Sequence, residues 1–346
     1  MNRRRAGLIG AVLGVAAAGV ATGVAAERYL VRRSRQVDDP YADEPFGKLP
    51  SDEQVCVTTT GGVDLYTEIV DGPVSDPTIV LVHGFCLDMG TFHFQRRHLG
   101  GRHRMVLYDQ PGHGRSGRLE EGEYTLEMLG DALRAVLRKT APDGKVVLIG
   151  HSMGGMAIMA LAEQAPEVFT DRVAGVVLLS TSAGNLDQVT FGLPEVVARF
   201  RHPLLPLVRN AGKITVAVVD RARSASTDLA WLLTRRYGFG NRRPPPSLVS
   251  YVERMNSSTS AEVIARYVRT LYVHARLLAL EALAAVPVLV VCGDSDVLTP
   301  LAHSQEICNA LPHAELVVVA QGGHVALLEH PDVVNEAIDD FLERLT

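Results

Sequence analysis

The sequence predicts an α/β protein with a doubly wound, mostly parallel sheet of eight strands and a helical cap inserted after the sixth strand. Three observations support this fold class. From residue 54 onward, short strand-like runs alternate with segments of helical periodicity. Most of the later runs are apolar at every position, as is typical of parallel strands covered on both faces. The alternation stops once, between about residues 186 and 280, where no run resembles a buried strand.

Composition indicates a globular protein with a sizeable core. The chain has 346 residues, of which 47% are hydrophobic and only 21% are charged. Its formal net charge of −5 is too small to indicate a nucleic-acid partner. The four cysteines are far apart, with no C-x-x-C pair: Cys56, Cys86, Cys292 and Cys308. We therefore expect buried free thiols, and neither a disulfide framework nor a zinc site.

The first 35 residues differ from the rest of the chain. Three arginines precede an uncharged run of 21 residues, Ala6–Ala26, and Glu27 and four arginines follow it. At ~1.5 Å per residue in a helix, this run is long enough to cross a bilayer. We predict that residues 1–35 are a retained membrane anchor; a signal cleaved near Val24–Ala26, giving an exported protein, and a soluble tail are the alternatives. Residues 36–53, with three prolines and several acids, are predicted to be a linker.

Eight strand candidates follow. The first two suit an opening hairpin, and the others suit buried parallel strands. They are residues 54–60, 63–70, 78–82, 104–108, 145–149, 173–180, 286–292 and 314–320.

Helical patterns lie between these strands. Thr125 is placed to cap a helix whose apolar residues share one face, and Pro331 is placed to open another. Between the sixth and seventh strands, residues 186–280 carry helical segments rich in Leu, Val and Arg, interrupted by prolines. We predict that this segment is a helical cap on a core made of residues 54–185 and 281–346.

The sequence GHSMG, residues 150–154, directly follows the fifth strand candidate, and a helix-prone segment comes next. A G-x-S-x-G turn between a strand and a helix forces its serine into a strained conformation. That conformation exposes the Ser152 hydroxyl beyond the carboxyl end of the sheet, where ligands of open α/β sheets bind. Side chains at Gly150 or Gly154 would strike the neighbouring strand and helix. We call residues 150–154 the elbow.

An acid and a base lie where this architecture brings them to the same edge. Asp294 and Asp296 follow the seventh strand candidate, and His324 follows the eighth. The chain order Ser…Asp…His resembles that of the α/β-hydrolase family, and the resemblance covers roughly residues 54–346. Three further segments resemble the family's oxyanion loop, the turn after its next strand and its acid loop. They are VLVHGFCLDMGTFHFQ (80–95), VLYDQPGHGRSG (106–117) and GDSDVLTP (293–300).

The resemblance implies a role for each residue. His324 would take the Ser152 proton, and Asp296 would orient the imidazole. Asp296 is preferred to Asp294 because the family's acid precedes a proline by four residues, as Asp296 precedes Pro300. Asp294 would then cap the loop. Backbone N–H groups of Phe85 and Met153 would form the oxyanion hole.

Other motifs have simpler interpretations. Residues 112–117 fit G-x-G-x-x-G, but no helix begins there, so we predict a turn and no cofactor. Cys86 has no evident base, and His151 is expected to pack beneath the elbow. His83 and Asp109 are expected to be structural polar groups. Five histidines match no common ligand spacing, so we predict no metal site: His83, His93, His98, His103 and His113.

The expected function is a serine hydrolase for a carboxylic ester or thioester, acting on a small-molecule ester or a lipid. Haloperoxidase-type chemistry without a cofactor, C–C bond hydrolysis and non-catalytic binding are the alternatives. Charge is unevenly distributed, because residues 186–280 contain 14 Lys and Arg against 6 Asp and Glu. A basic cap on an anchored protein suggests contact with anionic lipid. Simple solvation of a helical surface is the alternative.

Overall fold

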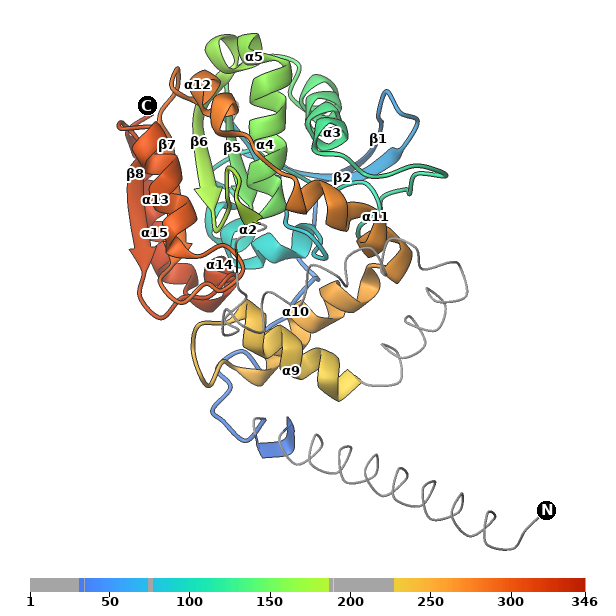
Figure 1. Cartoon of the computed structure of the whole chain (residues 1–346), viewed down its shortest axis with the longest axis vertical. Coiled ribbons are helices and arrows are strands. Elements are labelled where there is room, and N and C mark those ends of the chain that lie inside the picture. Colours follow the sequence, from blue (N-terminus) through green and yellow to red (C-terminus); the bar gives the residue numbers. More distant parts are fainter. Residues whose placement is uncertain (1–30, 34, 74–76, 187–188, 190–226, 346) are drawn as a thin grey trace, which may run out of the picture.

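The computed structural model describes residues 31–33, 35–73, 77–186, 189 and 227–345 (Figure 1). Its sheet has eight strands in the order β1-β2-β4-β3-β5-β6-β7-β8. The pairs β1/β2 and β2/β4 are antiparallel, and every other pair is parallel. The predicted mostly parallel, eight-stranded sheet is therefore confirmed. The strands are β1 Glu53–Thr58, β2 Asp64–Val70, β3 Thr78–Val82, β4 Met105–Tyr108, β5 Val146–His151, β6 Val173–Leu179, β7 Val288–Gly293 and β8 Glu315–Val319.

Both faces of the sheet are covered. Along β3, Val80 and Val82 belong to one buried cluster, whereas Ile79 and Leu81 belong to the cluster on the opposite face. A strand with two buried faces needs apolar side chains at every position, which explains its unbroken apolar run. One cluster includes residues of α3 (Leu126–Thr140), α4 (Met153–Gln164), α12 (Leu280–Leu283) and α13 (Leu301–Ala310). The other includes residues of α2 (His93–Leu99), α14 (Ala326–Glu329) and α15 (Pro331–Glu343).

Helix boundaries follow the predicted capping residues. The Thr125 hydroxyl accepts a hydrogen bond from Met128 N at 3.2 Å, and α3 begins at the next residue. Pro331 is the first residue of α15, where its missing N–H leaves no helical hydrogen bond unmade. Three short helical elements lie between the strands and longer helices: η1 Met89–Phe92, α5 Pro166–Asp171 and η4 Leu277–Ala279.

Helices also lie between β6 and β7. The described part of this segment contains α9 (Thr227–Gly238), α10 (Pro246–Ser258) and α11 (Ala261–Tyr272). Trp231 of α9 is buried, and its indole N–H donates to Ser250 Oγ of α10 at 3.0 Å. Helices α9 and α10 lie at the end of the molecule opposite α5 and α12 (Figure 1). Residues 187–188 and 190–226 of the predicted cap lie outside the described residues.

The predicted anchor also lies outside the described residues, which begin at Val31. Among the residues that the structure does describe, no helix has both the length and the apolar character needed to span a membrane. The stretch predicted as a linker is packed against the body of the protein up to the start of β1. Phe46 stacks on Tyr251 with ring centroids 4.5 Å apart, and Asp39 accepts hydrogen bonds from the Ser247 amide and hydroxyl.

Candidate active site

The elbow places one serine between a strand and a helix. β5 ends at His151 and α4 begins at Met153, so Ser152 alone makes the turn, with φ 53° and ψ −117°. Positive φ is uncommon for a residue with a side chain and stores strain. A Cβ atom on Gly150 would lie 2.6 Å from Gly155 N, and one on Gly154 would lie 1.9 Å from Val82 O. Both flanking positions therefore require glycine, as the motif predicts.

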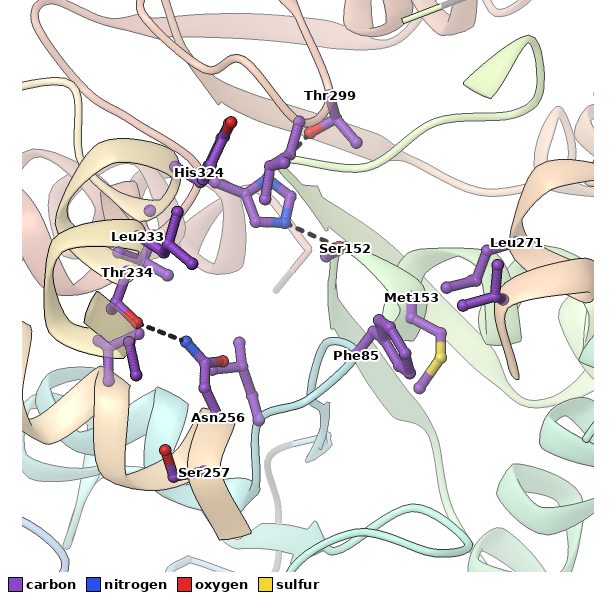
Figure 2. Close-up of a pocket in the computed structure, with 18 of the residues that line it drawn as sticks. Phe85, Ser152, Met153, Leu233, Thr234, Asn256, Ser257, Leu271, Thr299 and His324 are labelled. Atoms are coloured by element: carbon purple, nitrogen blue, oxygen red, sulfur yellow. Dashed lines mark hydrogen bonds between the residues drawn. The ribbon is translucent and has the colours of Figure 1, made fainter. Parts of the chain in front are cut away.

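Ser152, His324 and Asp296 lie together in one hydrogen-bonded chain. His324 Nε2 is 2.9 Å from Ser152 Oγ, and His324 Nδ1 is 2.9 Å from Asp296 Oδ2. Figure 2 shows the imidazole directed at Ser152, with Thr299 beside it. Because a carboxylate can only accept, Nδ1 carries the proton and Nε2 is free to accept from the serine hydroxyl. The structure thus brings together the three side chains selected from the sequence.

The Asp296 carboxylate is held by more than the histidine. Its Oδ1 accepts from Leu298 N at 2.8 Å and Thr299 N at 3.0 Å, while its Oδ2 accepts from the Thr299 hydroxyl at 2.7 Å. Burial alone would raise the pKa of Asp296, but His324 and the Thr299 hydrogen bonds outweigh it and hold this pKa below its ordinary value. Sequence reasoning missed Thr299. The available signal was the turn that an Asp side chain can form with the backbone two residues on, here at Leu298, which leaves Thr299 beside the acid.

Asp294 has a different set of partners. Its Oδ1 accepts from Gln321 N at 2.9 Å and from the Ser295 hydroxyl at 2.8 Å. The Asp294 carboxylate thus braces the loop after β7 against the loop after β8. These contacts match the loop-capping role predicted for it, and Asp296 is the residue that contacts His324.

The loop after β3 passes directly against the elbow. A Cβ atom on Gly84 would lie 3.1 Å from the Ser152 Cβ and 2.8 Å from His151 Nδ1. Phe85 and Met153, whose backbone N–H groups are the predicted oxyanion donors, line the same cavity as Ser152. Met153 is the first residue of α4, where amides point out of the helix without intrahelical acceptors.

Two buried histidines hold this loop. His83 Nε2 accepts from Gln110 N at 2.8 Å, and His113 Nε2 accepts from Cys86 N at 3.1 Å. Burial lowers the pKa of His113 to about 4 and that of His83 well below its ordinary value, so both remain neutral acceptors. No group of three or more His, Cys, Asp and Glu side chains in the described part of the chain could hold a metal ion. The prediction of buried thiols is confirmed for Cys292 but wrong for Cys56, which is exposed on the edge strand β1; Cys86 and Cys308 are half-buried.

His151 lies beneath the elbow and reaches the opposite loop. Its Nε2–H donates to the backbone oxygen of His324 at 2.9 Å. Burial and the nearby His324 ring lower the pKa of His151 to about 3, so it remains neutral at physiological pH. The side chain therefore supports the loop that carries His324.

The G-x-G-x-x-G match at residues 112–117 is a turn. A Cβ atom on Gly114 would lie 2.2 Å from Asp109 Oδ2, so this glycine makes room for a buried carboxylate. Asp109 accepts hydrogen bonds from Met89 N and Arg115 N, and burial raises its pKa to about 7. Helix α3 begins only at Leu126, too far along the chain to present its N-terminus to a phosphate bound at these glycines.

Comparison with known proteins identifies the family. Residues 77–331 match the family described as alpha/beta hydrolase fold. The chain belongs to the α/β-hydrolase family. RutD of Caulobacter sp. (strain K31), whose name refers to carbamate hydrolysis, is 28% identical over 82% of this chain and 97% of its own length. A thermophilic esterase from Thermogutta terrifontis has a similar structure, with a TM-score of 0.64 and 25% identity over 85% of this chain and 99% of the esterase.

A second similar structure aligns with the whole chain. A membrane phospholipase A, described as a bacterial virulence factor, aligns over 100% of this chain and 99% of its own, with a TM-score of 0.65. At 21% identity, this similarity shows a shared fold and nothing about substrate.

This α/β-hydrolase has a large apolar cavity beside Ser152. Its volume is about 660 Å³, within the range of roughly 300–1,000 Å³ usual for small-molecule sites. Figure 2 shows Phe85, Met153 and Leu271 on one side and Leu233 on the other. One polar contact lies in the wall of the cavity, where Asn256 Nδ2 donates to Thr234 Oγ1 at 3.1 Å. The hydrolase core and helices α9, α10 and α11 all contribute lining residues.

Glu329 joins the end of α9 to the loop that carries His324. Its Oε2 accepts from Gly240 N at 3.0 Å and Gly323 N at 2.8 Å, and its Oε1 accepts from Asn241 N at 2.7 Å. We call this arrangement the Glu329 clasp. Sequence reasoning missed it, and no motif signals it, because all three partners are backbone amides.

Proposed function

We propose that the protein is a serine hydrolase that cleaves a carboxylic ester or thioester through an acyl-enzyme. The observation that supports this proposal is the hydrogen-bonded chain Ser152–His324–Asp296 on the wall of an apolar cavity. A serine hydroxyl is a weak nucleophile unless an adjacent base removes its proton. His324 Nε2 lies within hydrogen-bonding distance of that hydroxyl, and Asp296 fixes the tautomer that can accept the proton.

In the proposed reaction, Ser152 Oγ attacks the carbonyl carbon while His324 Nε2 takes its proton. The carbonyl oxygen becomes negatively charged and accepts hydrogen bonds from the backbone N–H groups of Phe85 and Met153. Loss of one such donor typically raises the barrier by ~3–4 kcal/mol. The tetrahedral intermediate expels the alcohol or thiol, which takes the proton from His324. Water then attacks the acyl-enzyme by the same route and regenerates Ser152.

The cavity favours a substrate with a large apolar group next to the scissile bond. Its wall is built mainly from aliphatic, aromatic and methionine side chains, so burial of an acyl or alcohol chain there is favourable. Names of relatives that refer to esterase activity and carbamate hydrolysis are consistent with acyl transfer. Haloperoxidase-type chemistry without a cofactor, C–C bond hydrolysis and non-catalytic binding are the competing hypotheses.

Covalent labelling with a fluorophosphonate probe tests for an activated serine. We expect the wild-type protein to be labelled and Ser152→Ala to remain unlabelled, with its fold intact because only a hydroxyl is removed. Absence of labelling in the wild type would favour a binding protein. Hydrolysis of p-nitrophenyl esters of increasing chain length then tests the bond type. Ser152→Ala should retain less than about 1% of that activity, and higher retention would exclude Ser152 as the nucleophile.

We also propose an organisation for the whole chain. Residues 1–35 anchor the protein in a membrane, and residues 186–280 form a cap on a core of residues 54–185 and 281–346. The alternative is export after cleavage of the N-terminal segment. The intact mass of the protein from its native host distinguishes retention from cleavage. Resistance to extraction by alkaline carbonate would support the anchor, and complete release would contradict it.

A further inference from the structure

Helix α9 exposes two apolar side chains that also line the active-site cavity. Leu229 and Leu233 are each 48% exposed and lie one helical turn apart. Both are lining residues of the cavity that contains Ser152. Single exposed apolar side chains are ordinary on a protein surface. A pair of them beside an apolar cavity is typical of a surface that binds an apolar ligand, a membrane or another protein.

Basic residues follow this pair along the chain. Arg235 and Arg236 lie in the last turn of α9, and Arg242 and Arg243 are exposed in the loop that follows. We call Leu229, Leu233 and these four arginines the α9 patch. The acid on the helix, Asp228, has Arg35 Nη2 3.9 Å from its Oδ1. The patch therefore combines apolar side chains with a positive charge.

The described chain begins beside the same helix. Val31 is 2% exposed and packs in the cluster that contains Trp231 of α9, and the Arg35 guanidinium lies 5.4 Å from the centre of the Trp231 ring. Figure 1 shows this beginning of the chain next to α9, at one end of the molecule. Three exposed arginines follow Val31 in this short stretch: Arg32, Arg33 and Arg35.

The preceding sequence limits how far Val31 can lie from a bilayer. The uncharged run ends at Ala26, five residue steps before Val31. Five steps of fully extended chain span at most about 18 Å. If the uncharged run crosses a bilayer, Val31 must therefore lie within about that distance of the membrane surface, and the start of the described chain, which contacts α9 through Arg35, lies close to it. Tethering, exposed leucines and clustered arginines thus point to the same end of the molecule.

We propose that the α9 patch docks on an anionic lipid bilayer and opens the active-site cavity toward it. Leu229 and Leu233 enter the boundary between headgroups and acyl chains, and the arginines contact anionic headgroups. The substrate is then an ester of a membrane lipid whose acyl chain enters the cavity along α9. This choice of substrate rests on the proposed function, whereas the docking itself does not require catalysis.

Site-directed fluorescence tests the docking. Leu233→Cys in the full-length chain is labelled with bimane, in a Ser152→Ala, Cys56→Ser background, and reconstituted in phosphatidylglycerol vesicles containing brominated lipid. Val333→Cys is the matched control because Val333 is 43% exposed on α15, and the same background without an added cysteine gives the residual labelling. Leu229→Cys, one turn away, replaces Leu233→Cys if that variant does not fold.

We expect brominated lipid to quench the α9 probe at least threefold more than the Val333 probe. Replacing phosphatidylglycerol by phosphatidylcholine, or introducing Arg242→Glu together with Arg243→Glu, should reduce that quenching at least twofold. Equal quenching at both probes would overturn the docking, as would a protein that is not retained by the vesicles. Quenching that does not depend on lipid charge would overturn the role of the arginines. The Ser152→Ala background separates these outcomes from the proposed function, which fluorophosphonate labelling tests independently.

Discussion

Replacing Asp296 by asparagine changes one atom that contacts His324, and the structure gives the consequence. Asparagine Oδ1 can still accept from Leu298 N and Thr299 N, as Asp296 Oδ1 does. In the wild-type protein, Asp296 Oδ2 accepts hydrogen bonds from His324 Nδ1 and the Thr299 hydroxyl. In the variant, an NH2 group takes the place of this oxygen. An NH2 group cannot accept from Nδ1–H, so the imidazole must move its proton to Nε2. In that tautomer His324 cannot accept the Ser152 proton.

Because His324 is then in the wrong tautomer, we expect kcat to fall ~10⁴-fold, as it does for the corresponding substitution in chymotrypsin-type proteases. At 1.36 kcal/mol per tenfold, this corresponds to ~5 kcal/mol of barrier. Asp294→Asn is the matched control. Its Oδ1 keeps the acceptor position that contacts Gln321 N and the Ser295 hydroxyl, so we expect less than a tenfold loss.

Hydrolysis of a short p-nitrophenyl ester under saturating conditions measures both variants, with thermal melting as a check on folding. The pocket is untouched in both proteins, so KM should change little. Comparable losses for the two variants, or a larger loss for Asp294→Asn, would refute the assignment of Asp296. A folded Asp296→Asn protein with more than a tenth of wild-type kcat would refute the tautomer argument.

Three further predictions follow from named contacts. Gly154→Ala places a Cβ atom 1.9 Å from Val82 O, so chemical denaturation should show a loss of at least about 3 kcal/mol in unfolding free energy, whereas Gly61→Ala in an open turn should change it little. The pKa of His151 is lowered to about 3, so below about pH 6.5 the unfolded chain binds a proton at this residue that the folded protein does not bind. The unfolding free energy should therefore fall by about 2 kcal/mol between pH 7 and pH 5 because of this group. A His151→Asn variant whose unfolding free energy has the same pH dependence as that of the wild type would contradict this. Leu271→Trp narrows the cavity and should lower kcat/KM for long-chain esters at least tenfold relative to the acetate; equal losses for both would show that Leu271 does not contact the chain.

The strands were predictable because the hydrophobic pattern of each one lies within its own short segment. The residues at which the strands begin and end were harder to predict. β1 ends at Thr58, two residues before the predicted end, because the Thr59 hydroxyl accepts from Val63 N and turns the chain. β7 begins at Val288 rather than at residue 286, directly after Pro287, which has no N–H to donate to a sheet. The order of the strands depends on pairing between distant segments, which no local pattern records.

The catalytic candidates were predictable for a topological reason. Parallel strands end at the same edge of the sheet, so an acid after β7 and a histidine after β8 had to lie near the serine after β5. Thr299 and Glu329 were missed because their roles depend on hydrogen-bond partners that only the folded chain supplies. Three backbone amides surround the Glu329 carboxylate, and backbone amides have no sequence signature.

The Glu329 clasp has a consequence for protein engineering. Exchange of the helices between β6 and β7 for those of another family member is an obvious way to change substrate range. Here, however, the exchanged piece would include Gly240 and Asn241, whose amides hold the carboxylate that also binds Gly323, next to His324. A transplant that ignores this junction would lower turnover even on substrates that both parents accept. Residues 238–241 and residues 321–329, the loop after β8 together with α14, must therefore come from the same parent protein.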